Sequence, residues 1–283
     1  MNNIRSAAHS ARNRMPKWID TFARIGIASK GTVYILIGVL AAMAAFGQGG
    51  DSSADQESVF SWILQQPFGQ ILLGLVIIGL LCYFAWRMIM AFKDPDGNGT
   101  DTKGIIKRTG FFFSGLTYLF FAFMAARMLI PELGSGSGGG GGSGQETLIA
   151  KVLQQSYGQI LVGILAGIVI LKGFYELYRA VKHKFEGQVN ERSMNHKEHE
   201  VYSRAGRVGY VARSIVFVIL GYFLVRAAVE SDASETGGTG DALSFLSNSG
   251  GPYLLAAVAL GLAAYGIFMF IMSKYRHIPN VRV

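Results

Sequence analysis

Five ionisable side chains fall inside long apolar stretches of the sequence and are the best candidates for chemistry. A charge at the centre of a membrane span costs from about 2.5 kcal/mol upwards, so such residues commonly mark a functional site. Lys30 and Arg213 each lie six residues after an arginine that opens an apolar stretch, which is about 9 Å along a helix. We expect one belt near the inner face of a membrane bundle, made of Lys30, Arg87, Lys172, Glu176 and Arg213.

The belt has two interpretations, and the sequence leaves both open. Around a pseudo-threefold axis the belt would become a ring of four positive charges and one negative charge, which would bind an anion. Alternatively, the long cationic side chains extend to the lipid headgroups and a neighbour neutralises Glu176. Lys172 lies four residues before Glu176 and can pair with it within one helix, and Arg87 can pair with it across helices. We favour this second, structural interpretation.

Two further arginines, Arg127 and Arg226, occupy one repeat position near the opposite face. Glu132 and Glu230 lie close to them in the sequence. We therefore expect an ion-pair clasp at the outer face, in preference to a gate.

Other chemistry has little support. The sequence contains no nucleophile elbow, no phosphate-binding glycine loop and no pair of acids within a span, so we expect no enzymatic activity and no catalytic residue. His196 and His199 are three apart, but no third ligand is evident, and we expect a solvated charged loop without a metal site. No span contains a histidine that would ligate haem, and we expect no cofactor.

Transmembrane helices are the elements that must position the belt. The chain has 283 residues, of which 51% are hydrophobic and 16% charged, whereas about a quarter of the residues of a soluble domain are charged. The apolar residues form six runs, each long enough to cross a hydrocarbon core of about 30 Å. We therefore predict an all-α, polytopic membrane protein with spans at residues 25–46, 69–92, 109–130, 158–181, 208–229 and 253–273.

The six spans form three tandem two-helix repeats. The second helix of a repeat opens with Gly-Gln-Ile-Leu at Gly69 and Gly158, and with the looser Gly251-Pro252-Tyr253 in the third repeat. The first helix opens with an Arg-x-Gly motif, at Arg24-Ile25-Gly26, Arg108-Thr109-Gly110 and Arg207-Val208-Gly209. Three like repeats in one chain predict a pseudo-threefold arrangement.

Aromatic residues also follow the repeat. Tyr34, Tyr118 and Phe217 share one repeat position, and Tyr83 and Tyr265 share another. We interpret them as packing residues, since packing explains them more simply than a cofactor site does.

The repeats divide the chain into six parts. A short helix on the membrane surface is expected before each second span, at residues 57–64, 146–153 and 241–246, and a flexible Gly/Ser stretch at 134–144. The parts are a cytoplasmic interfacial segment (1–23), repeat 1 (24–93), a cytoplasmic loop with repeat 2 (94–182), a charged cytoplasmic loop (183–206), repeat 3 (207–275) and a cytoplasmic tail (276–283).

The distribution of charge predicts the orientation. Lys and Arg gather in the N-terminal segment and in the second and fourth loops, whereas Lys151 is the one basic residue of the other three loops. Because cytoplasmic loops hold the excess of basic residues, we expect both termini in the cytoplasm. The formal charge of +8 would then face anionic lipid headgroups, and we expect no nucleic-acid partner.

The repeat anatomy resembles a bacterial membrane family known as domain of unknown function 1206. The resemblance rests on the three Arg-x-Gly openings and on the Gly-Gln-Ile-Leu motif, and it extends from about Arg24 to Tyr275. It implies three two-helix repeats in the bacterial cytoplasmic (inner) membrane, and it implies no activity, cofactor or catalytic residue.

Two functions follow from this reading. The favoured one is a structural or accessory membrane protein that binds lipid, a membrane protein partner or a second copy of itself. The alternative is a channel or transporter for a small anionic solute, with a basic cytoplasmic vestibule. A transporter needs a water-accessible cavity lined by the belt residues, whereas a scaffold needs a packed axis.

Overall fold

The structure of the protein is a computed structural model that describes residues 17–47, 56–95, 97–130, 132, 144–189 and 193–276. Residues 1–16 of the predicted interfacial segment, residues 134–143 of the Gly/Ser stretch and residues 277–283 of the predicted tail lie outside the described residues.

Six helices of the described residues are long and apolar enough to cross a membrane. The predicted all-α fold with six spans is confirmed, because each of these helices contains or closely matches one predicted span. They are α2 (Lys17–Ala45), α4 (Gly69–Phe92), α5 (Thr102–Leu129), α7 (Gly158–Val181), α8 (His196–Glu230) and α9 (Thr239–Tyr275).

Helices α2, α5 and α8 begin earlier than the predicted spans, at Lys17, Thr102 and His196 instead of residues 25, 109 and 208. Helix α2 starts at Lys17, so residues 17–23 continue into the first span and do not form a separate segment. Helix α8 starts at His196, because Asn195 accepts a hydrogen bond from the Glu198 backbone N–H while the Glu198 carboxylate accepts one from the Asn195 N–H. This reciprocal capping box satisfies the first free N–H groups of a helix. The second half of the predicted loop 183–206 is therefore helical.

Short helices precede the second span of every repeat, as predicted. They are α3 (Gln56–Leu64), α6 (Gly144–Leu153) and the first part of α9. Within α9 the backbone breaks at Gly251, where φ is 75°, a value that costs glycine little. In α3, Val59, Phe60 and Ile63 are buried, so its apolar face packs against protein.

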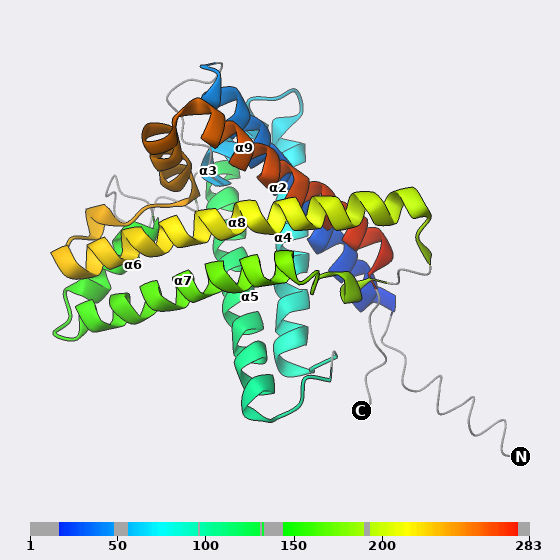
Figure 1. The fold of residues 1–283 in the computed structure, drawn as a ribbon, viewed down its shortest axis with the longest axis horizontal. Coiled ribbons are helices and arrows are strands. Elements are labelled where there is room, and N and C mark those ends of the chain that lie inside the picture. Colours follow the sequence, from blue (N-terminus) through cyan, green and yellow to red (C-terminus); the bar gives the residue numbers. More distant parts are fainter. Residues whose placement is uncertain are drawn as a thin grey trace, which may run out of the picture.

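The spans pack as three antiparallel pairs: α4 with α5, α7 with α8, and α9 with α2. Each pair joins the second helix of one repeat to the first helix of the next, and α9 with α2 closes the cycle from repeat 3 to repeat 1. The three pairs point in three different directions and meet near the middle of the molecule (Figure 1). This cyclic pairing is the relation that a pseudo-threefold arrangement requires.

The entry arginines stabilise two of these pairs. Arg108 donates from Nε to the carbonyl oxygen of Ala91, 2.7 Å away, and from Nη2 to that of Phe92, 3.1 Å away. Arg24 donates from Nη1 to the carbonyl oxygens of Ser273, at 3.1 Å, and of Lys274. These carbonyls occupy the same repeat positions at the C-terminal ends of α4 and α9, where the helix dipole favours a cation. The third entry arginine, Arg207, lies exposed within the long helix α8.

Two glycines of the Arg-x-Gly motif, Gly26 and Gly209, lie where the two helices of a repeat pack closely. A Cβ atom on Gly26 would lie 2.5 Å from the backbone N of Tyr83, and one on Gly209 would lie 2.6 Å from the Cα of Tyr265. Helix α2 therefore packs closely on α4, and α8 on α9. In the part of the chain that the structure describes, α5 and α7 do not pack against each other in this way, and a Cβ on Gly110 would meet nothing within 4 Å. The ring of pairs is thus open between α5 and α7.

Candidate functional site

Lys30 lies at the point where four helices converge, and its exposed fraction is 5%. Its ammonium nitrogen faces four tyrosine rings from α5, α4, α9 and α2. The distances from Nζ to the ring centroids are 5.1 Å for Tyr118, 5.2 Å for Tyr83, 5.6 Å for Tyr265 and 5.7 Å for Tyr34. Aromatic faces within about 6 Å attract a cation, and more strongly where water is excluded. We call this group of residues the cation–tyrosine cluster. It consists of Lys30, the four tyrosines and the neighbouring charged residues Arg87, Lys172, Glu176, Arg179 and Arg213.

Arg213 of α8 shares two of these rings with Lys30. Its guanidinium carbon lies 4.3 Å from the ring centroid of Tyr265 and 5.4 Å from that of Tyr34. Its Nη1 lies 3.4 Å from Oε2 of Glu176. Arg213 occupies the repeat position of Lys30, so two equivalent cations of repeats 1 and 3 meet on the same aromatic rings.

Glu176 of α7 supplies the negative charge of the cluster, and its side chain is 1% exposed. Lys172 Nζ lies 2.7 Å from its Oε1 within the same helix. The partner across helices is Arg213 and not Arg87, which the sequence had offered as an alternative. Glu176 therefore pairs with one cation of repeat 2 and one of repeat 3.

Arg87 of α4 has an aromatic environment. Its Nε donates a 3.0 Å hydrogen bond to the Tyr83 hydroxyl, and its Nη2 donates to the same oxygen. Its guanidinium carbon lies 4.9 Å from the Tyr83 ring centroid and 5.3 Å from that of Phe111. Since Lys30 also faces the Tyr83 ring, the structure brings Arg87, Lys30, Arg213, Glu176 and Lys172 into one connected cluster.

Sequence reasoning missed Arg179, a further cation of this region. Its guanidinium carbon lies 4.5 Å from the Tyr210 ring centroid, and Tyr210 packs edge to face on Tyr265 at 5.4 Å. Its position three residues after Glu176 places it on the same side of α7. Two buried nitrogens, Arg179 Nη2 and Arg213 Nε, have no hydrogen-bond partner.

The structure places acidic side chains beside Arg226 and an aromatic ring near Arg127. Arg226 forms the predicted type of clasp, with Nη2 3.0 Å from Oε1 of Glu230 and Nη1 2.8 Å from Oε2 of Glu235. Arg127 lies with its guanidinium carbon 5.9 Å from the Phe123 ring centroid. The sequence had not indicated Glu235 as the second acid.

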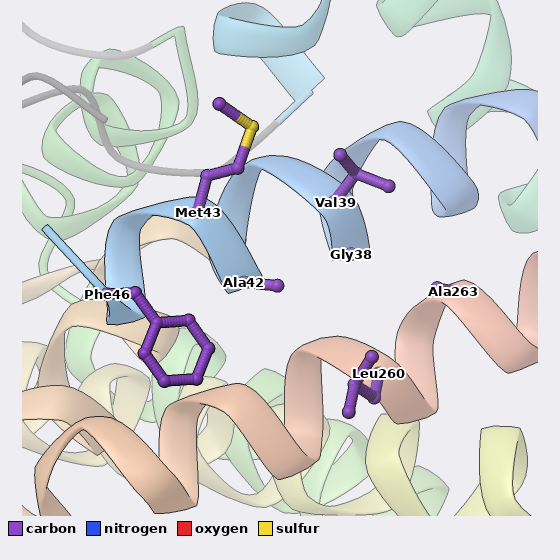
Figure 2. Close-up of a pocket in the computed structure, with 7 residues that line it drawn as sticks. All are labelled: Gly38, Val39, Ala42, Met43, Phe46, Leu260 and Ala263. Atoms are coloured by element: carbon purple, nitrogen blue, oxygen red, sulfur yellow. The ribbon is translucent and has the colours of Figure 1, made fainter. Parts of the chain in front are cut away.

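An apolar groove of about 250 Å³ lies between the C-terminal half of α2 and the facing part of α9, away from the cluster. Figure 2 shows Met43 and Phe46 of α2 on one side of it and Leu260 of α9 on the other. Its lining has no charged side chain: Gly38, Val39, Ala42, Met43, Phe46, Leu260 and Ala263. It offers no group for chemistry.

The Glu186 carboxylate stabilises the connection between α7 and α8. Glu186 Oε1 lies 2.9 Å from His183 Nδ1 and accepts a 2.6 Å hydrogen bond from the Ser203 hydroxyl. Partial burial alone would raise the pKa of the Glu186 carboxyl, but these hydrogen bonds lower it below its ordinary value. In the described residues no three His, Cys, Asp or Glu side chains gather as metal ligands would.

Fold and site together define an all-helical protein of three tandem two-helix repeats, with six helices that are long and apolar enough to cross a membrane. The chain belongs to the family Domain of Unknown Function (DUF1206), which matches residues 25–94, 109–183 and 208–276. Each match begins one residue after an entry arginine. The chain is 33% identical, over 261 residues, to the Uncharacterized protein YxxB of Bacillus subtilis (strain 168), and the alignment covers 92% of each protein. No solved structure matches the chain.

Proposed function

We propose that this protein is a non-enzymatic structural or accessory protein of the bacterial cytoplasmic membrane, which binds lipid or a membrane partner and uses no cofactor. The observation that carries the proposal is the cage of four tyrosine rings around Lys30. These rings fill the point where the pairs α4–α5 and α9–α2 meet. A filled crossing suits a scaffold whose helices keep one arrangement.

Charge pairing within the cluster supports the same proposal. Lys30, Glu176 and Arg213 are buried, and Glu176 links α7 to α8 through Arg213. Partners of this kind fix which helix faces meet, as polar groups between membrane helices commonly do. The cluster then stabilises the packing of the helix pairs against one another.

We also propose that both termini lie in the cytoplasm. In this orientation the basic N-terminal segment and the basic second and fourth loops face the anionic leaflet. Lys93, Lys103 and Lys107 would lie near the headgroups on this side.

Anion transport is the second candidate, and one observation favours it. The cluster contains five cations, namely Lys30, Arg87, Lys172, Arg179 and Arg213, beside one acid, Glu176. A transported anion would be attracted by this excess of positive charge. The closed arrangement of rings around Lys30 opposes a path through the centre.

Flux measurements on reconstituted protein separate the two candidates. Full-length protein is placed in vesicles that enclose an anion-sensitive dye, and the entry of chloride or phosphate is followed. A scaffold gives the same flux as empty vesicles. Flux that is several-fold above this background in the wild type, and returns to it in Lys30→Met, would overturn the scaffold and establish transport.

A further inference from the structure

The opening between α5 and α7 coincides with one change in the repeat pattern. Lys172 occupies the repeat position that Tyr83 and Tyr265 occupy in the other two repeats. Those tyrosines pack against Gly26 and Gly209 and thereby join the two helices of their repeats. In repeat 2 the corresponding glycine, Gly110, has open space beside it. The replacement of tyrosine by lysine therefore leaves a seam in the ring at the level of the cation–tyrosine cluster.

Small residues keep this seam open on the α5 side. Ser114 stands at the repeat position of Lys30 and Arg213, so repeat 2 adds no long side chain there. Helices α5 and α7 are also the least buried of the six spans: 17% and 22% of their most apolar windows are buried, against 39–56% in the others. Both walls of the seam thus remain accessible from the side of the bundle.

Lys172 is the accessible cation of this region. Its side chain is 45% exposed, whereas the residues Lys30 and Arg213 are 5% and 7% exposed. An ammonium group has three N–H donors. One donor is directed to Oε1 of Glu176, 2.7 Å away, so that donors remain for a ligand.

Positive charge exceeds negative charge in this region. The cluster has five cations and one carboxylate, and the buried nitrogens Arg179 Nη2 and Arg213 Nε have no acceptor. A buried charge or donor without a partner is costly. Tyrosine rings attract cations but remain neutral, so a bound anion would lower the free energy of this region more than another aromatic residue would.

We propose that the seam between α5 and α7 binds a phosphate group through Lys172, with the cation–tyrosine cluster supplying the attractive field. The group is either the headgroup of an anionic phospholipid that enters sideways from the membrane or an inorganic phosphate that enters from the inner side. Basic sites between membrane helices near the cytoplasmic face suit such headgroups. This inference rests on the proposed function as a lipid-binding membrane protein.

Thermal unfolding of the full-length protein in nanodiscs tests the proposal and separates the two sources. One preparation has phosphatidylcholine alone, a second adds phosphatidylglycerol, and a third adds inorganic phosphate to phosphatidylcholine at constant ionic strength. A ligand that binds the folded state raises the unfolding midpoint. A rise with phosphatidylglycerol alone identifies the lipid headgroup, and a rise with inorganic phosphate identifies the free ion. No rise in either preparation overturns the proposal.

Two variants and a control test whether the rise in the unfolding midpoint comes from binding at the seam. Lys172→Tyr restores the residue of the other repeats and closes the seam against Gly110, and Lys172→Gln removes the charge while leaving the seam open. Both should lose at least half of the rise. Lys103→Gln removes an exposed charge at the start of α5 and should keep the whole rise. An unchanged rise in both Lys172 variants would overturn the site, while the flux measurement would still decide on the scaffold independently.

Discussion

Glu176 is the residue on which the charge balance of the cluster depends most. It is buried between Lys172 of its own helix and Arg213 of α8. Replacing it with glutamine keeps the shape and removes the negative charge, which leaves two neighbouring cations without a carboxylate. We expect Glu176→Gln to lower the free energy of unfolding by about 3 kcal/mol, since breaking a buried ion pair from one side is strongly destabilising.

Unfolding of the purified protein in a mild detergent measures this loss. Glu200→Gln is the matched control, because Glu200 pairs with Arg204 at 2.6 Å on the exposed start of α8 and exposed pairs contribute about 0–1 kcal/mol. Equal effects of the two substitutions would mean that the Glu176 pairs add nothing beyond a surface pair.

The sequence identified five charged residues of the cluster but not the tyrosine rings that surround Lys30. Lys30, Arg87, Lys172, Glu176 and Arg213 were visible because a charge stands out in an apolar run. The tyrosine cage was not visible, although the recurrence of Tyr34 with Tyr118 and of Tyr83 with Tyr265 was. Repeat position says which residues are equivalent, whereas the meeting of four rings on one lysine depends on how the pairs α4–α5 and α9–α2 cross.

At the scale of helices, the Arg-x-Gly glycines provide a matched comparison. A methyl group on Gly26 would lie 2.5 Å from the backbone of Tyr83, while one on Gly110 would meet nothing within 4 Å. We expect Gly26→Ala to destabilise the protein by about 1–3 kcal/mol, the usual cost of overpacking. Gly110→Ala should cost nothing, because alanine is at least as good a helix former as glycine.

The unfolding midpoints of the two alanine variants check this expectation. A loss of stability in Gly110→Ala as large as that in Gly26→Ala would show that α5 and α7 pack closely, and would remove the seam from the account.

The entry arginines provide a second comparison between repeats. Arg108 donates two hydrogen bonds to the last carbonyls of α4, whereas Arg207 is exposed. Hydrogen bonds from a charged donor contribute about 1.5–3 kcal/mol, so Arg108→Gln should destabilise the protein by an amount in this range. Arg207→Gln should change the unfolding free energy little, and a comparable loss in both variants would contradict the capping role.

Helix ends were the part of the elements that the sequence predicted least well. The apolar run of the fifth span starts near Val208, but α8 begins at His196. Hydropathy marks where a helix enters the membrane and not where it begins. The Asn195–Glu198 capping box was the local signal of that beginning, and the Glu198 carboxylate also accepts hydrogen bonds from Lys274 and Tyr275 at the end of α9, contacts that depend on the tertiary fold.

At the scale of the molecule, the orientation of the termini can be tested directly. Fusions of a reporter that folds in the cytoplasm to either terminus should be active. A periplasmic or extracellular reporter inserted in the loop before α3 should be active as well, because the basic loops remain inside. The reverse pattern of activities would contradict the proposed orientation.

The cyclic pairing of helices follows from the repeats, but the opening of the ring does not. A complete pseudo-threefold arrangement would have three equivalent junctions within repeats, and the structure has two of them in its described residues, at Gly26 with Tyr83 and at Gly209 with Tyr265. Lys172 in place of a tyrosine was visible in the sequence. The opening between α5 and α7 that follows from it depends on the tertiary structure, in which a Cβ on Gly110 would meet nothing within 4 Å.

The central claim is that the crossing of the helix pairs is filled and closed to water. Single cysteines at positions 30, 176 and 213, in a Cys82→Ser background, test it with a membrane-impermeant thiol reagent applied from the cytoplasmic side. A cysteine at exposed position 103 serves as the positive control. The account predicts strong labelling at 103 and protection at 30, 176 and 213 in folded protein. Labelling of the three central positions at rates close to that at 103 would contradict it and would establish an aqueous path to the cluster.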